Sequence, residues 1–180
     1  MKPEDNQQRG LAAARSPIVS DQMREAIARL PTGVTVVTTV DEGRSLTGAT
    51  LSSFTQVSLE SPSVLICVNR DSRTCDAVDR SGIFAVNVLA ASQERVARAF
   101  SMPGESQDEK FASVHWSARK TGAPVFDGVC SWMDCVTLDR HDFGTHAVFI
   151  GAVVAAGSDT WDEAPLTYYR HRIFPLRERA

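Results

Sequence analysis

Short runs of β-branched residues with alternating polarity constrain the fold of this sequence more than any other feature. In residues 33–40 (GVTVVTTV), Val34 and Val36 share one face of an extended chain, while Thr35 and Val37 share the other. Five further runs have a strand-like composition, at residues 46–54, 63–69, 83–89, 129–138 and 146–156. The sequence therefore predicts about six short strands and a mainly β protein.

Turn residues between these runs predict how the strands pair. Residues 41–43 form an expected turn that makes residues 46–54 the hairpin partner of residues 33–40, and a second turn is expected at residues 142–145. Antiparallel sheets of short strands tend to close on themselves because closure removes exposed edges. We therefore expect a small β-barrel with short peripheral helices. A Rossmann sheet is disfavoured, since the sequence has no GxGxxG, GxxxxGK[ST] or GxSxG motif.

Three short helices are expected, over residues 21–30, 72–80 and 92–100. In the first, Met23, Ile27 and Leu30 repeat at spacings of four and three, which is typical of an amphipathic helix. In the second, Ser72 has the position of an N-cap and Gly82 that of a C-terminal stop. These helices are expected at the periphery of the sheet.

Composition limits the domain organisation and the partners. The chain has 180 residues, 43% of them apolar, which suits one domain and leaves no room for a second. We assign this domain to residues 20–180, and residues 1–19, which lack a sustained period, to a flexible N-terminal arm. Nineteen basic and 22 acidic residues give a net charge of −3, so nucleic acid is not an expected partner. No apolar run approaches the roughly 20 residues that cross a bilayer and no secretory signal is evident, so we expect a cytoplasmic protein without membrane contact.

The cysteines and histidines do not form a pattern typical of a disulfide framework or a metal site. No two of the four cysteines have CxxC spacing, and Cys130 and Cys135 would lie on opposite faces of a strand. The four histidines have no HExxH or other ligand spacing, so no bound metal is expected. Cys67 and Cys135 also lack a local pattern that would activate a thiolate nucleophile.

A cluster of hydroxyl groups beside a strand end is the first candidate for ligand binding. Thr50, Ser52 and Ser53 lie close together and precede Phe54. Such hydroxyls, with exposed main-chain amides, would hold a polar heterocycle or a sugar chain. The alternative is a hydroxyl-rich strand edge with no ligand.

Residues 69–74 (NRDSRT) are the second candidate. They place Ser72, Arg73 and Thr74 at the N-terminus of a predicted helix. Free amides, the positive end of the helix dipole, hydroxyls and a guanidinium together favour an anion, most commonly phosphate. The alternative is an ordinary N-cap with a solvated arginine.

His146 is the third candidate. It stands at the start of an apolar run in the segment GTHAVFIG, where its imidazole would project into a pocket at the rim of the barrel. The alternative is a core histidine that bonds to the main chain.

Eight segments, in order over residues 21–176, resemble the flavin reductase-like family. They are LPTGVTVVTT, GATLSSFTQVSLESPSVLICVN, RDSRTCDAV, FAVNVLAASQERVARAF, KF at residues 110–111, GAPVFDGVCSWMDC, GTHAVFIGAVV and PLTYYRHRIFPL. The chain is similar to the small reductase components of two-component flavin-dependent monooxygenases. It departs from the family at Ser61, where a second proline often stands beside Pro62, and at Thr145, where an acidic residue often precedes the histidine.

This resemblance implies a split β-barrel of the FMN-binding type that forms a homodimer, with FMN or FAD near the subunit interface. Residues 50–53 would lie along the isoalloxazine ring and ribityl chain, and residues 69–74 would hold the phosphate. His146, the implied catalytic residue, and residues 168–170 would lie on the nicotinamide side of the site. The implied cofactor-binding residues are Thr50, Leu51, Ser52, Ser53, Cys67, Asn69, Ser72, Arg73, Thr74, Ala99, Phe100 and Tyr169.

The function implied by the resemblance is that of an NAD(P)H:flavin oxidoreductase, which reduces FMN or FAD with NADH or NADPH and supplies it to a partner monooxygenase. Hydride transfer is the chemistry of the cofactors themselves, so the protein needs no strong acid or base. Two alternatives stay open. One is a non-catalytic flavin carrier or sensor on the same barrel, and the other is an oxidase of a small phosphorylated substrate.

Overall fold

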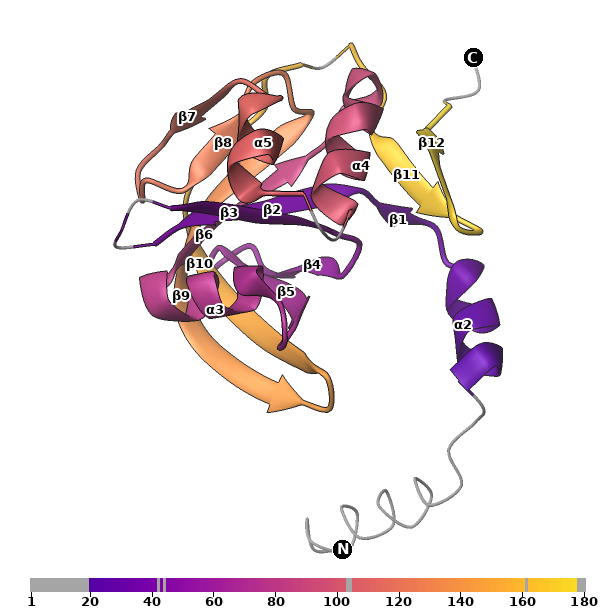
Figure 1. Cartoon of the computed structure of the whole chain (residues 1–180), viewed down its shortest axis with the longest axis horizontal. Coiled ribbons are helices and arrows are strands. Elements are labelled where there is room, and N and C mark those ends of the chain that lie inside the picture. The colour runs from indigo at the N-terminus through magenta and orange to yellow at the C-terminus, as the bar shows by residue number, and fades with distance from the viewer. Residues whose placement is uncertain (1–19, 42, 44, 103–104, 161, 178–180) are drawn as a thin grey trace, which may run out of the picture.

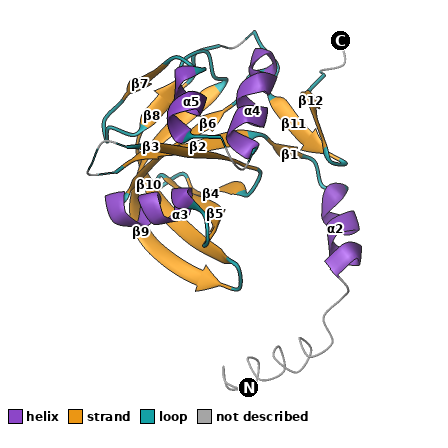
Figure 2. Ribbon diagram, in the orientation of Figure 1, coloured by secondary structure: helices purple, strands orange, loops and turns teal. Residues whose placement is uncertain are grey.

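The computed structural model of the chain describes residues 20–41, 43, 45–102, 105–160 and 162–177. The expected arm at residues 1–19 lies outside this range, as does Glu42 of the first expected turn. Within the described residues the protein is mainly β, with short helices placed around the strands (Figure 1; Figure 2).

A seven-stranded antiparallel sheet forms the centre of the fold, in the order β3-β2-β6-β9-β10-β5-β4. Its strands are β2 (Thr35–Val40), β3 (Leu46–Leu51), β4 (Phe54–Ser58), β5 (Ser63–Asn69), β6 (Ile83–Val88), β9 (Ser131–Phe143) and β10 (His146–Gly157). The expected hairpin of β2 and β3 is confirmed, since Val36 is in register with Thr50 and Val40 with Leu46.

The two edge strands of this sheet are neighbours in the chain. β3 ends at Leu51 and β4 begins at Phe54, so the sheet must curve until its opposite edges approach each other (Figure 1). The prediction of one strand over residues 46–54 is therefore wrong. The physical reason is that Ser53 already pairs with β5, the strand beside the other edge: its hydroxyl donates to the carbonyl of Cys67 at 2.7 Å, and its carbonyl accepts from the Cys67 amide at 3.0 Å.

The hairpin of β9 and β10 is shared between the two halves of the curved sheet. β6 pairs with β9 over residues 131–136, whereas β5 pairs with β10 over residues 146–152. β9 continues through Phe143, so the tight turn consists of residues 144–145 and is shorter than the expected turn at 142–145. β9 and β10 are long because they pair with each other and also with β6 and β5, respectively. The apolar pattern of the sequence does not predict this length.

Two smaller sheets complete the strands and are absent from the sequence-based prediction. One contains β1 (Thr32–Gly33), β11 (Leu166–Tyr169) and β12 (Arg172–Pro175), and the other contains β7 (Trp116–Ala118) and β8 (Pro124–Phe126). These strands have two to four residues each, which is too short for an alternating pattern to emerge.

The helices of the described chain are α2 (Ser20–Ala28), α3 (Arg73–Ser81), the 3₁₀-helix η1 (Ala91–Gln93), α4 (Glu94–Ser101) and α5 (Gln107–Ala112). The three expected helices are confirmed, and α5 is additional. Its sequence signal is the capping box of Ser106 and Glu109, in which the Ser106 hydroxyl accepts from the Glu109 amide at 3.2 Å and the Glu109 carboxylate accepts from the Ser106 amide at 3.1 Å. None of these helices is long and apolar enough to span a membrane.

Strand β2 separates two hydrophobic clusters. Val37 packs in one of them with Ile66 and Phe84, and Val36 packs in the other with Phe100. The alternation predicted for residues 33–40 is thus confirmed, but the strand is buried on both faces. Burial on both faces fixes the β2–β3 hairpin between the two clusters and makes it a rigid base for the residues of β3.

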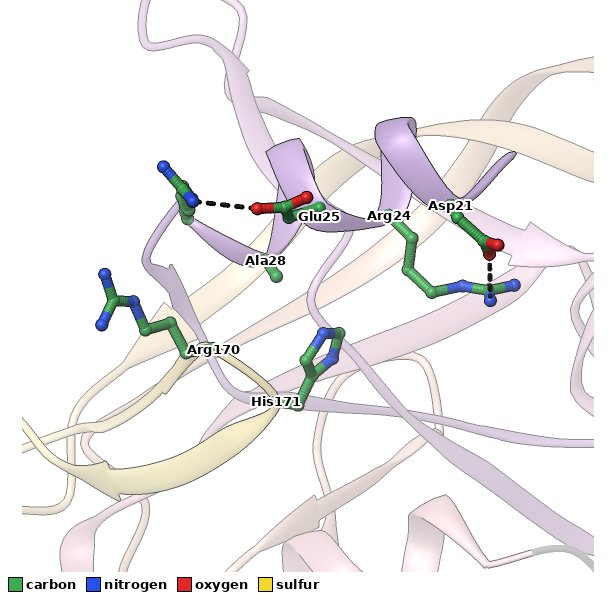
Figure 3. Close-up of a pocket in the computed structure, with 7 residues that line it drawn as sticks. Asp21, Arg24, Glu25, Ala28, Arg170 and His171 are labelled. Carbon is green, nitrogen blue, oxygen red and sulfur yellow. Dashed lines mark hydrogen bonds and ion pairs between the residues drawn. The ribbon is translucent and has the colours of Figure 1, made fainter. Parts of the chain in front are cut away.

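α2 lies at one side of the molecule, next to the turn between β11 and β12 (Figure 1; Figure 3). The Arg170 amide donates to the carbonyl of Ala28 at 2.8 Å and so ties the helix end to that turn. The apolar residues expected to form one face of this helix are not buried in the described part of the chain. Met23, Ile27 and Leu30 remain 48%, 52% and 56% exposed.

Candidate functional site

A cleft of about 650 Å³ opens between β3 and the helices α3, α4 and α5. It is lined by Gly48, Ala49, Asn69, Ser72, Arg73, Thr74, Phe100, Ser101, Met102, Glu105, Ser106, Gln107 and Lys110. The structure therefore brings five of the predicted residues into one cleft, although they are separated in the sequence: Asn69, Ser72, Arg73, Thr74 and Phe100.

Three contacts hold the floor of the cleft together. A Cβ on Gly48 would lie 2.9 Å from Cε1 of Phe100, so the ring of Phe100 packs directly over the main chain of β3. The side-chain oxygen of Gln107 accepts from the Gly48 amide at 3.0 Å, and the Thr50 hydroxyl donates to the carbonyl of Ala97 at 2.6 Å. These contacts fasten α4 and α5 to β3. The sequence analysis missed Gly48 and Gln107, and nothing in their local sequence indicates a contact across 59 residues.

The N-terminus of α3 presents donors to the cleft. The Ser72 hydroxyl serves as the N-cap, since it accepts from the Cys75 amide at 3.1 Å and donates to the carbonyl of Asn69 at 2.7 Å. The groups left for an anion are the main-chain amides of Arg73 and Thr74 and the Thr74 hydroxyl, none of which has a hydrogen-bond partner within the described residues. Thr74 is only 3% exposed as a residue, but its hydroxyl is not one of the buried side-chain atoms without a partner, so the hydroxyl reaches the cleft surface, where a ligand or water can bond to it.

Two cationic side chains line the same cleft. Lys110 is 5% exposed, and its ammonium donates to the carbonyl of Met102 at 2.7 Å. Neither Lys110 nor Arg73 has a carboxylate within 4.0 Å in the part of the chain that the structure describes. Because uncompensated cations near a partly buried surface attract anions, the cleft is suited to phosphate groups. Lys110 was noted from the sequence only as part of the KF segment at residues 110–111, and no local pattern predicts its burial.

The predicted hydroxyl cluster continues from the cleft toward β4. Thr50 follows the cleft-lining Ala49, and its hydroxyl proton is used to hold α4. Leu51 is half-buried and packs against the core, whereas Ser52 is exposed and its hydroxyl makes no hydrogen bond to the described residues. The Ser53 hydroxyl is used to join β4 to β5. Of these hydroxyls, only that of Ser52 is uncommitted.

Cys67 lies on β5, half-buried, and Ala99 lies on α4, half-buried beside Phe100. All four cysteines are free thiols. Burial raises the pKa of Cys67 above its ordinary value and raises the pKa of Cys135 to about 12, so both stay protonated near neutral pH and neither is an activated nucleophile. Within the described residues there is no group of three His, Cys, Asp or Glu side chains that would hold a metal ion.

His146 lies at the rim of this region. It is the first residue of β10, in register with the cleft-lining Asn69 of β5. The side chain is exposed, so the alternative of a core histidine is wrong. The imidazole Nδ1 is 2.9 Å from the Thr145 hydroxyl, and this threonine therefore orients the ring although it replaces the acidic residue common in the family.

Tyr169 lies apart from the cleft, on β11, with the guanidinium carbon of Arg170 5.3 Å from its ring centroid. The turn formed by Arg170 and His171 faces α2 across a separate open pocket of about 400 Å³ (Figure 3). Both turn residues have positive φ, at 50° and 61°. The two residues expected on the nicotinamide side therefore lie in different places within one chain. His146 is beside the cleft, and Tyr169 does not line it.

The fold and cleft together define a mainly β protein with a cleft whose cationic side chains and helix N-terminus suit an anionic ligand. The chain belongs to the flavin reductase like domain family, whose model matches residues 27–177. The expected family is therefore confirmed.

Known relatives agree with this assignment. The chain is 38% identical over 159 residues to the reductase subunit HsaB of a flavin-dependent monooxygenase from Rhodococcus jostii, covering 88% of this chain and 79% of that protein. It is 39% identical to FMN reductase (NADH) RutF 2 of Methylorubrum extorquens, covering 84% of this chain and 88% of the relative. Among solved structures, the NADH:FAD oxidoreductase SgcE6 of Streptomyces globisporus, in complex with NAD and FAD fragments, superposes with a TM-score of 0.83 at 33% identity, covering 92% and 97% of the two chains.

Proposed function

We propose that the protein is an NAD(P)H:flavin oxidoreductase that reduces FMN or FAD and supplies the reduced flavin to a partner monooxygenase in the cytoplasm. The observation that carries the proposal is the N-terminus of α3, where two main-chain amides and the hydroxyl of the cleft-lining Thr74 have no hydrogen-bond partners among the described residues. Family membership and the names of the relatives support the same function.

In this proposal the curved sheet is a split barrel, and the cleft residues bind and orient the flavin. Arg73, Thr74 and Asn69 hold the phosphate, while Phe100 and residues 50–53 provide the surface for the ring and ribityl chain. The remaining predicted contacts are Cys67 and Ala99. Flavin and nicotinamide supply the hydride chemistry when bound, and the chain contributes position and exclusion of water.

His146 is the residue proposed to position the nicotinamide. Its Nδ1 is engaged by Thr145, Nε2 has no hydrogen-bond partner among the described residues, and its strand neighbour Asn69 lines the cleft. In this role the imidazole of His146 orients the nicotinamide and transfers no proton to it. The role therefore depends on the position of the ring and does not require a shifted pKa. Tyr169 remains a proposed contact on the nicotinamide side.

A spectrophotometric assay with the full chain tests the function. NADH or NADPH is mixed with FMN or FAD in all four combinations, and the loss of the nicotinamide absorbance band is followed. Rapid loss that requires both flavin and enzyme supports the reductase. Flavin binding without nicotinamide oxidation would instead identify the carrier or sensor, and flavin reduction by a phosphorylated organic substrate alone would identify the oxidase.

We further propose a homodimer in which a second copy covers the exposed face of α2. Met23 and Ile27 on α2, with Leu30 just after its C-terminus, are exposed apolar side chains, whereas Ala28 of the same helix is buried. Contiguous exposed apolar surface on a soluble protein commonly marks an interface. Equilibrium sedimentation should give about twice the chain mass, and Ile27→Glu should shift the protein toward the monomer. A monomeric wild type with full activity contradicts this proposal.

We also propose that residues 20–180 contain the complete functional domain. The family match begins at residue 27, and among the described residues the lining of the cleft begins at Gly48. A variant lacking residues 1–19 should therefore retain nearly all flavin reduction. A folded truncation with a large loss of turnover would assign a role in the site to those residues.

A further inference from the structure

A second hollow, of about 330 Å³, continues the cleft on the far side of Arg73. Three residues line both spaces: Arg73, Ser106 and Gln107. The second hollow lies over the beginning of β3, between one face of α3 and the first turn of α5. It is otherwise lined by Asp41, Ser45, Leu46, Thr47, Asp76, Arg80 and Asp108.

Strand β3 orders the whole site along a line. The hydroxyl segment begins at Thr50, Gly48 and Ala49 line the cleft, and residues 45–47 line the second hollow. Since a strand rises about 3.3 Å per residue, the second hollow begins roughly 10 Å beyond Thr50 and extends about 7 Å further. A ligand with its ring at residues 50–53 and its first phosphate at the α3 N-terminus therefore reaches the second hollow only if it continues past that phosphate.

The chemistry of the second hollow differs from that of the cleft. Asp41, Asp76 and Asp108 supply carboxylates, which accept hydrogen bonds from ribose hydroxyls and from an exocyclic amine. Leu46 adds an apolar surface, and the planar guanidinium of Arg80 is able to stack on a flat base. Adenosine has ribose hydroxyls and an exocyclic amine for the carboxylates and a flat base for Leu46 and Arg80. FMN ends at its phosphate and has no group that would occupy this hollow.

We propose that this protein is built for FAD in preference to FMN, with the pyrophosphate between Arg73 and Lys110 and the adenosine in the second hollow. A pyrophosphate has two anionic groups in series, and Arg73 and Lys110, on the α3 and α5 sides of the cleft, have no carboxylate within 4.0 Å among the described residues. The proposal rests on the proposed flavin reductase function and makes it specific, because it names which flavin the site selects.

Affinities measured by calorimetry for FAD, FMN and riboflavin test the proposal on the full chain. FAD should bind at least about tenfold more tightly than FMN, because the adenosine contacts and the second phosphate add to those that FMN makes. Equal affinities, or tighter binding of FMN, would overturn the preference for FAD while the reductase function stands. Failure to bind any flavin would overturn the proposed function itself.

A variant that fills the second hollow gives a second readout. Ser45 is exposed and bonds to Asp41 through its main chain only, so Ser45→Trp places a large side chain in the hollow without removing a side-chain contact. FAD affinity should fall about tenfold while FMN affinity moves less than about twofold. The matched control is Ser61→Trp, at an exposed turn residue outside the cleft and the hollow, which should leave both affinities unchanged. Equal losses for FAD and FMN in Ser45→Trp, or no loss for FAD, would contradict the placement of adenosine.

Discussion

The ring of Phe100 occupies the space that any side chain on residue 48 would need. A Cβ built on Gly48 would lie 2.9 Å from Cε1 and 3.0 Å from Cδ1 of this ring, and 3.2 Å from the carbonyl oxygen of Val37. The ring cannot withdraw easily, because it is 3% exposed and packs edge-on against Phe111 with centroids 5.1 Å apart. The floor of the cleft therefore depends on a glycine.

Gly48→Ala should destabilise the protein by about 1–3 kcal/mol, since overpacking forces α4 away from β3. Flavin affinity should fall at the same time, because Phe100 and the α4–α5 region shift together. Chemical denaturation and flavin titration measure the two effects. Gly33→Ala is the matched control, since nothing lies within 4 Å of its added Cβ. A neutral Gly48→Ala variant would show that the helix adjusts without cost.

The anion site predicts a selective loss for phosphorylated flavins. Replacing both Arg73 and Thr74 by Ala removes a charge-assisted donor and a neutral donor, so FMN affinity should fall about tenfold or more. Riboflavin has no phosphate and should be affected far less. The Thr74→Ser variant, which keeps the hydroxyl, serves as the control and should bind FMN nearly as the wild type does. Equal weakening of FMN and riboflavin would assign these residues to the ring or the fold.

His146→Ala should raise the KM for NADH or NADPH and leave flavin affinity nearly unchanged. Because the side chain is exposed, its removal leaves no cavity, and the free energy of unfolding should change by no more than about 0.5 kcal/mol. Steady-state kinetics and thermal denaturation separate these effects. Thr145→Val should give a smaller rise in KM, since it removes only the group that orients Nδ1. Unchanged kinetics in His146→Ala would remove this residue from the site.

The turn between β11 and β12 holds two non-glycine residues in the left-handed region. Arg170 and His171 have φ values of 50° and 61°, a conformation that costs L-residues roughly 1–2 kcal/mol each. His171→Gly should therefore raise the stability by about 1 kcal/mol, reduced somewhat by loss of the contact of 3.2 Å between the Tyr168 hydroxyl and His171 Nδ1. Thermal denaturation measures this effect, with Gly144→Ala at another positive-φ turn as the expected destabilising counterpart. A lower melting temperature in His171→Gly would mean that the tyrosine contact outweighs the strain.

The capping box of α5 links the cleft to pH. The hydroxyl and amide of Ser106 hydrogen-bond to the Glu109 carboxylate and hold its pKa below the ordinary value. A carboxyl group with a lower pKa in the folded state stabilises fully above its unfolded pKa, and the contribution is lost as the pH falls through the folded value. Flavin affinity should therefore decline below about pH 4.5, because α5 carries Gln107 and Lys110 to the cleft.

Ser106→Ala tests this link at neutral pH, where it should destabilise by about 1 kcal/mol and weaken flavin binding. Ser113→Ala, at the opposite end of α5, is a comparison that leaves the capping box intact. If flavin affinity in Ser106→Ala matches that of the wild type, α5 is held by Gln107 and Phe111 alone.

The sequence by itself determined the local elements with clear periodic or capping signals. The alternation in residues 33–40 defined β2, and Ser72 and Gly82 marked the ends of α3, because these signals act between residues a few positions apart. The ordered segments also identified the family, and the predicted N-terminus of α3 made residues 69–74 a candidate anion site. Ser106 and Glu109 carry an equally local signal for the start of α5, the capping box.

Only the tertiary structure decided which residues share the site. The contacts of Gly48 with Gln107 and of Thr50 with Ala97 span 59 and 47 residues, and no local pattern specifies such pairs. Burial of Lys110 and the continuation of the cleft toward Ser45 likewise depend on how the helices pack on β3. The break between β3 and β4 depends on the curvature of the sheet, because the chain passes from one edge strand to the other within two residues. Sequence periodicity reflects interactions between residues a few positions apart, whereas the contacts that form the cleft depend on how distant segments pack together.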